Sequence, residues 1–354
     1  MNYPYVSLFT GAGGLDAGLV SAGLTPLLAQ DIDPHAVDTI RAAGHRVIAG
    51  DLLDVREEVL DAAGTDVFAV VGGPPCQSFS TAGKRGGVAD PRGGLVYAFL
   101  DTALALAPRF IVMENVTGLR QAAGRGGRPL LGEVHDRLRA AGYTSLSATV
   151  NAADYGTPQY RQRVLVIASR DGEPVFVPQP THFREHQHPA YRWRTVADAF
   201  AGLDDPGECA EFSDATIGYL RHVPPGGNWR DLPAELVDAA MGTGRGGGGA
   251  TGYYRRLGWD VPSPTLVTSP AQRSTLLAHP TEDRPLSVRE YARLQGFADD
   301  HVFCGPRAAK YRQIGNAVPV ALGEAVGRML VSVARAGHVV PTKRPGRGYV
   351  VTPD

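Results

Sequence analysis

The sequence predicts an α/β protein with a doubly wound, mostly parallel sheet and a smaller, irregular second lobe. In the first half of the chain, short apolar runs end at glycines, prolines or acidic residues and alternate with segments at helical spacing, which is the pattern of βα units. From about residue 171 to 283 this alternation stops, and prolines, glycines, histidines and aromatic residues dominate. A chain of 354 residues is long enough for both parts.

Charge and cysteine content restrict the partners and the kind of site. The 35 basic and 36 acidic side chains nearly cancel, so a polyanionic partner has to be met by local basic patches. Cys76, Cys209 and Cys304 form no C-x-x-C pair, which argues against a metal site or a disulfide framework and suits a reducing cytosol. There is no leader-like N-terminus and no apolar run of membrane-spanning length, so we expect a soluble cytoplasmic protein.

The first βα unit carries a glycine turn. Residues 5–9 predict a strand, residues 10–14 (TGAGG) a turn, and an apolar-periodic helix follows towards Ala22. Glycines let a ligand approach the backbone, and a helix N-terminus offers free N–H groups. The dinucleotide pattern G-x-G-x-x-G would need a glycine where Asp16 stands, which disfavours a nicotinamide-dependent oxidoreductase. A turn that binds a carboxylate and a ribose fits better.

Acidic residues end the next two strands. A strand over residues 27–31 finishes at Asp31, twenty positions after Gly11, the spacing at which a carboxylate reaches ribose hydroxyls. Beside it, Ile32 can cover an adenine face. A strand over residues 46–49 leads to Asp51, which can accept from the adenine amino group. Any one of these acids alone is more often a solvated loop residue, but together with the glycine turn they predict an adenosine cofactor.

Cys76 follows a further buried strand, predicted over residues 67–71 (VFAVV). The glycines and prolines of residues 72–75 end this strand, because proline lacks the N–H that a ladder needs. Ligands bind outside the carboxyl ends of parallel strands, so we interpret Cys76 as a nucleophile, although a lone cysteine is more often structural. Another buried strand, over residues 110–113, brings Glu114 to the same edge as a candidate general acid.

Basic residues occur in a loop and between two later strands. The glycine-rich loop at residues 80–87 is either a lid that closes over the substrate or a flexible connector. Between strands predicted over residues 143–150 and 164–168, Arg161 and Arg163 alternate with Gln162. At strand spacing both guanidinium groups face one side and form a paired cationic face. The alternative is a solvated edge strand.

These segments resemble, in order and spacing, the motifs of the cytosine-5 DNA methyltransferases that use S-adenosylmethionine. Six short stretches carry the resemblance: FTGAGG at 9–14, GPPCQ at 73–77, ENV at 114–116, QYRQR at 159–163, the segment 284–297 and QIGNAVP at 313–319. It covers roughly residues 5–170 and 284–330. The resemblance implies a Rossmann-like methyltransferase sheet with a target-recognition domain.

It also implies a covalent mechanism. Cytosine C5 is a poor nucleophile, so the Cys76 thiolate first adds to C6 of a flipped-out base. Glu114 then acts at N3, and Arg163 together with Arg161 stabilises the O2 side as charge builds in the ring. The implied residues of the S-adenosylmethionine site are Phe9, Thr10, Gly11, Ala12, Gly13, Gly14, Asp31, Ile32, Asp51, Leu52, Pro75, Asn316 and Val318.

In the irregular part, a Thr-Leu element at residues 265–266 resembles one that lies near the flipped base in the family. The candidate DNA-binding residues are Gln77, Ser80, Lys84, Arg85, Arg245, Arg255, Thr265 and Leu266. For any single loop arginine, simple solvent exposure is the alternative. Residues 287–290 form a capping box that starts a helix through Gln295, and an amphipathic helix over residues 315–335 is expected to return to the first domain.

We therefore expect a catalytic, cofactor-binding domain over residues 1–175, and a target-recognition domain and hinge over 176–309. A C-terminal helix over 310–337 and a tail over 338–354 complete the chain. The expected partner is double-stranded DNA, with a restriction endonuclease for the same site left open. We expect a monomer without membrane contact that associates with the nucleoid when bound to DNA.

Two alternatives stay open within the resemblance. The transfer-RNA branch of the family carries a Cys-Phe-Thr element in its recognition lobe, and this sequence has none there. A non-catalytic homologue that only binds DNA is disfavoured by the presence of Cys76, Glu114 and Arg163.

Overall fold

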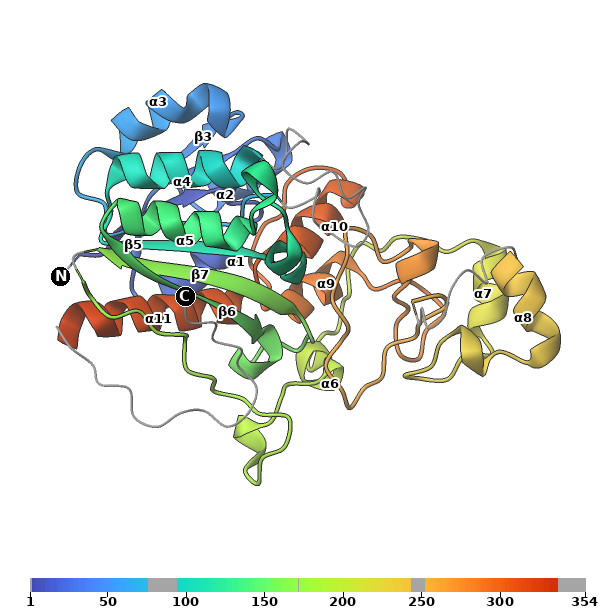
Figure 1. Cartoon of the computed structure of the whole chain (residues 1–354). Helices are drawn as coiled ribbons and strands as arrows, with labels where there is room; N and C mark the ends of the chain where they lie inside the picture. Colours follow the sequence, from blue (N-terminus) through green and yellow to red (C-terminus); the bar gives the residue numbers. More distant parts are fainter. Residues whose placement is uncertain (1, 76–93, 171, 243–251, 337–354) are drawn as a thin grey trace.

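The centre of the protein is a seven-stranded sheet in the order β3-β2-β1-β4-β5-β7-β6, seen in a computed structural model that describes residues 2–75, 94–170, 172–242 and 252–336 (Figure 1). The strands are β1 (Pro4–Leu8), β2 (Thr25–Asp31), β3 (Val47–Ala49), β4 (Ala69–Gly72), β5 (Phe110–Val116), β6 (Tyr143–Asn151) and β7 (Gln162–Arg170). From β3 to β5 neighbouring strands run parallel. Only β7 is reversed, antiparallel to both β5 and β6.

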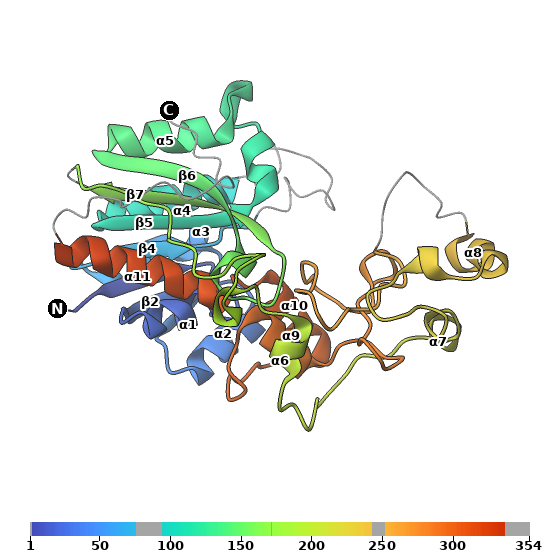
Figure 2. The ribbon, with the colours of Figure 1, turned by 90° about the horizontal axis from the view of Figure 1, so that it is seen from below.

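Helices cover both faces of this sheet (Figures 1 and 2). One face carries α3 (Leu52–Ala63), α4 (Leu95–Leu106) and α5 (Leu130–Ala140), and the other carries α1 (Gly14–Ser21), α2 (Pro34–Ala42) and α11 (Val320–Ala336). Side chains alternate between the two cores, because successive residues of a strand point to opposite faces. In β1, Val6 and Leu8 join the first core and Tyr5 joins the second. The predicted doubly wound, mostly parallel α/β fold is confirmed.

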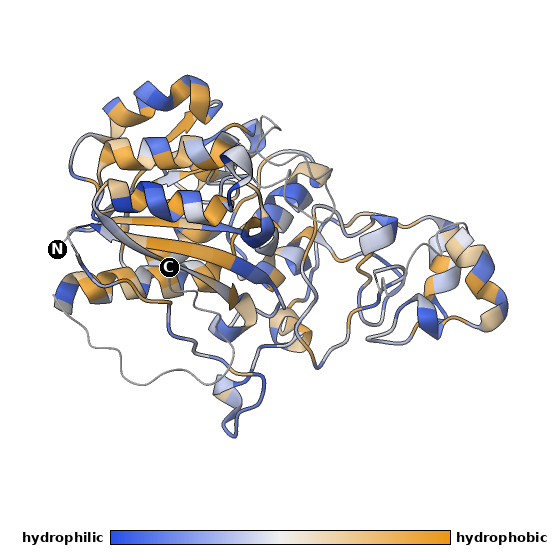
Figure 3. Cartoon of the chain, viewed as in Figure 1, coloured by the Kyte–Doolittle hydropathy of each residue, from blue (hydrophilic) through white to orange (hydrophobic). Residues whose placement is uncertain are grey.

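A second lobe extends away from one end of the sheet (Figure 1). It contains the short helices α7 (Asp214–Leu220) and α8 (Ala234–Met241), joined by irregular segments, whereas α6 (Val196–Phe200) lies nearer to the sheet domain. The lobe's own small core includes Leu220, Met241 and Tyr254. Figure 3 shows that this lobe is a mixture of polar and apolar segments, whereas β5 and β7 in the sheet are apolar over most of their length. The irregular character expected for this part of the chain is therefore found.

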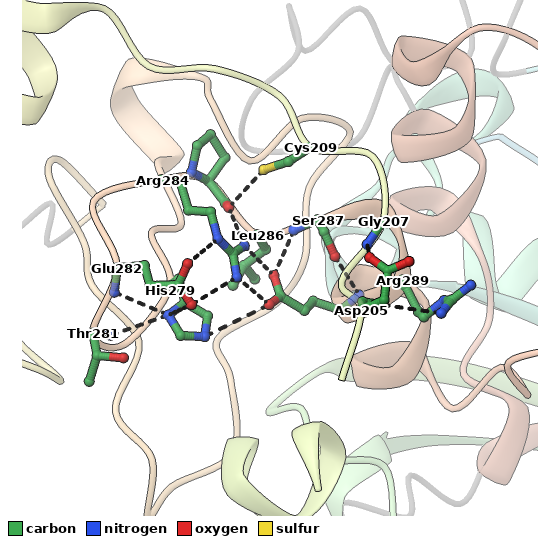
Figure 4. Close-up of polar contacts among 12 residues, drawn as sticks. Asp205, Gly207, Cys209, His279, Thr281, Glu282, Arg284, Leu286, Ser287 and Arg289 are labelled. Atoms are coloured by element: carbon green, nitrogen blue, oxygen red, sulfur yellow. Dashed lines mark hydrogen bonds and ion pairs between the residues drawn. The ribbon is translucent and has the colours of Figure 1, made fainter. Parts of the chain in front are cut away.

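A hinge region joins the two parts through α9 (Val288–Gln295) and α10 (Arg307–Asn316). The predicted capping box is confirmed: Ser287 Oγ accepts from Glu290 N at 3.1 Å, and Ser287 N donates to Glu290 Oε2 at 2.7 Å. The Glu290 carboxylate also receives both terminal nitrogens of Arg284 at 2.8 Å (Figure 4). Beside it, His279 Nδ1 accepts from the backbone N–H groups of Thr281 and Glu282. This buried polar cluster fixes the base of the second lobe.

Two predicted element boundaries are wrong. The single helix expected over residues 315–335 is divided, because α10 ends at Asn316 and α11 begins only after Pro319, which lacks the N–H that would continue a helix. Strand β5 does not stop at Met113 but continues through Glu114 to Val116, since antiparallel pairing with β7 extends it. Glu114 therefore lies within a strand.

Helix α11 returns to the sheet domain, as expected, and packs closely on α1. A Cβ atom on Gly18 would lie 2.2 Å from the carbonyl oxygen of Val320, so only glycine permits this approach. Within the described ranges no helix by itself is long and apolar enough to cross a membrane, and α10 with α11 meet that test only as a bent pair, by length and composition.

Candidate active site

A buried ion pair marks the junction of β5 and β7. Arg163 Nε lies 2.8 Å from Glu114 Oε1, and each side chain is 11% exposed. The antiparallel register places Arg163 opposite Val116, two residues beyond Glu114, so the two side chains extend from the same face of neighbouring strands. Burial lowers the pKa of Arg163, while the facing carboxylate of Glu114 opposes that shift. Both predicted residues are thus brought together with opposite charges.

The segment that leads to Cys76 lies against this pair. A Cβ atom on Gly73 would be 3.3 Å from Glu114 Oε2, and Asn115 Nδ2 donates to the carbonyl oxygen of Pro74 at 3.1 Å. Cys76 itself lies outside the described residues, and so do Gln77, Ser80, Lys84, Arg85 and Arg245. Pro75, the neighbour of Cys76, is the last described residue of the segment. Asn115 was not among the predicted site residues, although an amide directly after Glu114 was a usable signal.

The glycine turn after β1 is tied to Asp31. Gly11 N donates to Asp31 Oδ2 at 2.7 Å, and Asp33 N donates to Asp31 Oδ1 at 2.8 Å. Left-handed backbone at Phe9, Gly11 and Gly13 shapes the turn. Burial raises the pKa of Asp31, and the backbone donors partly offset that shift. A carboxylate has about four lone-pair sites, so the Asp31 side chain keeps capacity to accept a ligand hydroxyl.

Asp16 explains why this turn departs from the dinucleotide pattern. Its Oδ2 accepts from Thr10 Oγ1 at 2.7 Å and from Ser7 Oγ at 3.0 Å, so the carboxylate fastens the turn to β1 from inside. Burial raises the pKa of Asp16. Ala12 is fully buried in an apolar cluster around α9 and α10, the hinge core, which also contains Leu286, Tyr291 and Ile314. Position 16 thus holds the turn in place rather than contacting a ligand backbone.

The neighbouring strand ends carry the other predicted cofactor residues. Ile32 is 61% exposed directly after β2, so a large apolar surface faces outward there. Asp51 caps α3 by accepting from Leu53 N at 3.0 Å, and Leu52 is buried. One unpredicted residue joins these ends: Gln30 accepts from Phe9 N and donates to the carbonyl oxygen of Gly50. No local sequence signal identifies it.

The break between α10 and α11 packs on the glycine turn. A Cβ atom on Gly14 would lie 2.2 Å from the carbonyl oxygen of Val318. Val318 is buried, and the neighbouring Asn316 is exposed at the end of α10. The structure therefore brings the first and tenth motif segments into direct contact.

The two arginines of the paired motif have different partners. Arg161 is 2% exposed, and its guanidinium donates to the carbonyl oxygens of Leu266, Gly315 and Ala317 at 3.1, 2.9 and 3.1 Å. Arg163 instead pairs with Glu114. Burial lowers the pKa of Arg161, and the nearby charge of Arg163 lowers it further while that of Glu114 opposes the shift. The two guanidinium groups are therefore neighbours, but they differ in their bonding partners.

The Thr-Leu element is held against the same segment. Thr265 Oγ1 donates to the carbonyl oxygen of Tyr160 at 2.9 Å, and Leu266 N donates to Gln159 Oε1 at 3.0 Å. Thr265 is exposed, whereas the Leu266 side chain is buried in the hinge core. Of the two, only the Thr265 side chain is open to a partner in this arrangement. Arg255 is half-buried, which lowers its pKa.

A separate large cavity lies away from the Glu114–Arg163 ion pair. It encloses about 1050 Å³ between α11, the end of α9 and the segment after β7, with Phe176, Phe297 and Met329 among its lining residues. Neither Glu114 nor Arg163 lines it. We locate the candidate site by its chemistry, since paired charges at a strand edge are more specific than cavity size. Among the described residues, no three His, Cys, Asp or Glu side chains are grouped to hold a metal ion.

The strand order, the glycine turn after β1 and the acids at the following strand ends define a Rossmann-like methyltransferase. Comparison with known proteins makes this specific. The family of C-5 cytosine-specific DNA methylases matches residues 3–332, and the chain belongs to that family.

Named relatives agree with this assignment. The chain is 39% identical over 347 residues to the Type II methyltransferase M.Eco47II of Escherichia coli, covering 93% of this chain and 79% of the relative. It is 37% identical over 333 residues to the Type II methyltransferase M.Sau96I of Staphylococcus aureus, covering 93% and 76%. A solved DNA modification methyltransferase encoded within a prophage in E. coli shares the fold, with a TM-score of 0.68, 23% identity, and coverage of 94% and 99%.

Proposed function

We propose that this methyltransferase transfers a methyl group from S-adenosylmethionine to C5 of a cytosine within a short sequence of double-stranded DNA, as a Type II modification enzyme. The observation that carries the proposal is the buried Glu114–Arg163 pair beside the segment that leads to Cys76. The similarity to Type II methyltransferases supports the restriction-modification context, with an endonuclease that acts on the same site. We expect a cytoplasmic monomer.

Catalysis begins at the flipped-out base. The Cys76 thiolate forms a bond to C6, and the ring becomes an enamine whose negative charge spreads to N3 and O2. Glu114 hydrogen-bonds or protonates N3, and Arg163 stabilises the charge at O2. After C5 has gained the methyl group, a base removes the C5 proton, the C6–S bond breaks, and the Cys76 thiolate leaves.

The pairing of Glu114 with Arg163 suits this task. A charge pair already in place before the base arrives needs little reorganisation when charge develops in the ring. Hydrogen bonding of Asn115 to Pro74 keeps the nucleophile segment at the same edge. We propose that the role of Asn115 is to hold this segment in register.

The donor site is assigned to the ends of β1, β2 and β3. S-adenosylmethionine supplies an electrophilic methyl group on its sulfonium when bound. Asp31 has free lone pairs for the ribose hydroxyls, Ile32 presents an exposed apolar surface for the adenine, and Asp51 stands at the adjacent strand end. The remaining residues of this site are Phe9, Thr10, Gly11, Ala12, Gly13, Gly14, Leu52, Pro75, Asn316 and Val318.

We assign target recognition to residues 176–309 together with the hinge, and catalysis to residues 1–175. The segment 310–337 closes the catalytic domain, followed by a tail over 338–354. Thr265 and Arg255 are the described candidates for DNA contact. Gln77, Ser80, Lys84, Arg85 and Arg245 complete the set.

Labelled methyl transfer tests the proposal. Transfer to mixed-sequence DNA should occur with the wild-type chain and vanish in Cys76→Ser, while Cys304→Ser serves as a control cysteine that lies outside the proposed site and keeps activity. A duplex with 5-fluorocytosine at the target should trap the protein covalently, since fluorine replaces the proton to be lost. Transfer that survives in Cys76→Ser contradicts the mechanism, and methylation of transfer RNA instead of DNA contradicts the substrate. Bisulfite sequencing of DNA from expressing cells then gives the target site.

A further inference from the structure

One buried guanidinium joins three segments of the chain. Arg161 is 2% exposed. It donates to Leu266 O in the Thr-Leu loop at 3.1 Å, and to Gly315 O and Ala317 O before α11 at 2.9 and 3.1 Å. Because the Arg161 side chain is buried, it ties the positions of the two loops to each other.

The two loops also touch backbone to backbone. A Cβ atom on Gly315 would lie 2.1 Å from the carbonyl oxygen of Val267, so the end of α10 packs directly on the loop that follows Thr265. On its other side, the break before α11 packs on the glycine turn after β1, where a Cβ atom on Gly14 would lie 2.2 Å from the carbonyl oxygen of Val318. Directly packed segments therefore connect the glycine turn after β1, through the break between α10 and α11, to the Thr-Leu loop.

Two buried glutamines complete the junction. Gln295 Nε2 donates to Ile314 O at 2.9 Å and to Ala317 O at 2.6 Å. Gln159 Oε1 accepts from Leu266 N at 3.0 Å, and its amide nitrogen donates to Gln295 Oε1. The same two loops are thus held a second time, by uncharged groups that cannot replace the five donors of an arginine.

We infer that Arg161 is a positioning residue that couples binding of the cofactor to binding of the DNA target. The inference rests on the proposed function, in which Asn316 and Val318 belong to the S-adenosylmethionine site and Thr265 contacts the DNA. A ligand that orders one loop reduces the entropic cost of ordering the other, because the loops are joined by the Arg161 hydrogen bonds and by the backbone contact at Gly315. The coupling is reciprocal, so each ligand raises the affinity for the other by the same factor.

The test measures DNA affinity with and without S-adenosylhomocysteine, by fluorescence anisotropy of a duplex that carries the site found by bisulfite sequencing. In the wild-type chain S-adenosylhomocysteine should tighten DNA binding by about fivefold or more, the lower end of typical coupling factors. In Arg161→Lys this ratio should fall to within about twofold of one, because an ammonium cannot reach carbonyls of both loops in the same geometry.

Arg256→Lys is the matched control. Arg256 is 4% exposed and donates to the carbonyl oxygens of Val223, His279 and Leu220, so it is an equally buried arginine that braces the second lobe alone. Its replacement should weaken DNA binding without changing the ratio. Gly315→Ala, which separates the loops, should lower the ratio as Arg161→Lys does, and it keeps the inference testable if Arg161→Lys fails to fold.

An unchanged ratio in folded Arg161→Lys or Gly315→Ala overturns the inference, and so does a wild-type ratio of one. Failure of the proposed function is visible separately, as absence of labelled methyl transfer by the wild-type chain, which would overturn both. Transfer by the wild type combined with an unchanged ratio in the variants overturns the coupling alone.

Discussion

The ion pair between Glu114 and Arg163 offers the most direct test of the site's construction. Glu114→Gln keeps the side-chain volume but removes the charge that faces Arg163 at 2.8 Å, where each side chain is 11% exposed. Breaking a buried pair by removing one partner costs about 3–5 kcal/mol, because the remaining charge is left uncompensated. Since some solvent still reaches both groups, we expect the lower end, a loss of about 3 kcal/mol in the free energy of unfolding.

A double-mutant cycle in urea checks this reasoning. The cycle compares Glu114→Gln, Arg163→Met and the double variant, whose loss should be smaller than the sum of the single losses by about 1 kcal/mol or more. The exposed pair of Asp38 and Arg41, 3.4 Å apart with side chains 56% and 55% exposed, is the control. Its coupling should stay below about 1 kcal/mol. Equal coupling energies for the two pairs would refute the assignment of a buried pair.

The same variant has a catalytic readout. In buffer without denaturant, at a temperature where Glu114→Gln is folded, the rate of labelled methyl transfer should be about 10²–10⁴-fold lower than in the wild type. This is the usual contribution of a positioned acid. Retention of activity within about tenfold of wild type would show that Glu114 stabilises the fold without acting on the base.

Two further predictions concern packing and pH. Gly14→Ala should weaken S-adenosylhomocysteine binding in calorimetry by about tenfold or more, because its Cβ meets the Val318 carbonyl at 2.2 Å, whereas Gly94→Ala, with nothing within 4 Å, should not. Burial lowers the pKa of His279, although Glu290 at 3.8 Å opposes the shift. The folded state then binds fewer protons than the unfolded state, so the free energy of unfolding should decline as the pH falls below about 6.5. His279→Gln should flatten this decline in urea titrations between pH 8 and 5, and an unchanged slope would contradict the role of His279.

The sheet and the order of its functional strand ends could be predicted from the sequence, because each depends on local patterns. Apolar runs that stop at glycine, proline or acid predict strand ends, and parallel topology collects those ends at one edge. Asp31 and Glu114 reach that edge as expected, Glu114 inside β5 rather than after it. Even so, the helix boundary at Pro319 and the long β5 depend on a partner element, which periodicity alone does not reveal.

Arg161 shows why some contacts of the site could not be predicted from the sequence. Its partners are carbonyl oxygens 105, 154 and 156 positions away, and a carbonyl acceptor carries no sequence signature because every residue has one. Strand spacing made Arg161 and Arg163 equivalent, yet Arg161 stands just before β7, which begins at Gln162, and its guanidinium donates to carbonyl oxygens of the hinge. One arginine therefore balances the charge of Glu114, while the other ties together the loops on which both proposed ligands depend. The short motif that contains both arginines is thus proposed to contribute to catalysis and also to connect the two loops. Comparing Arg163→Met with Arg161→Lys distinguishes a loss of catalysis from a loss of coupling between the two ligands.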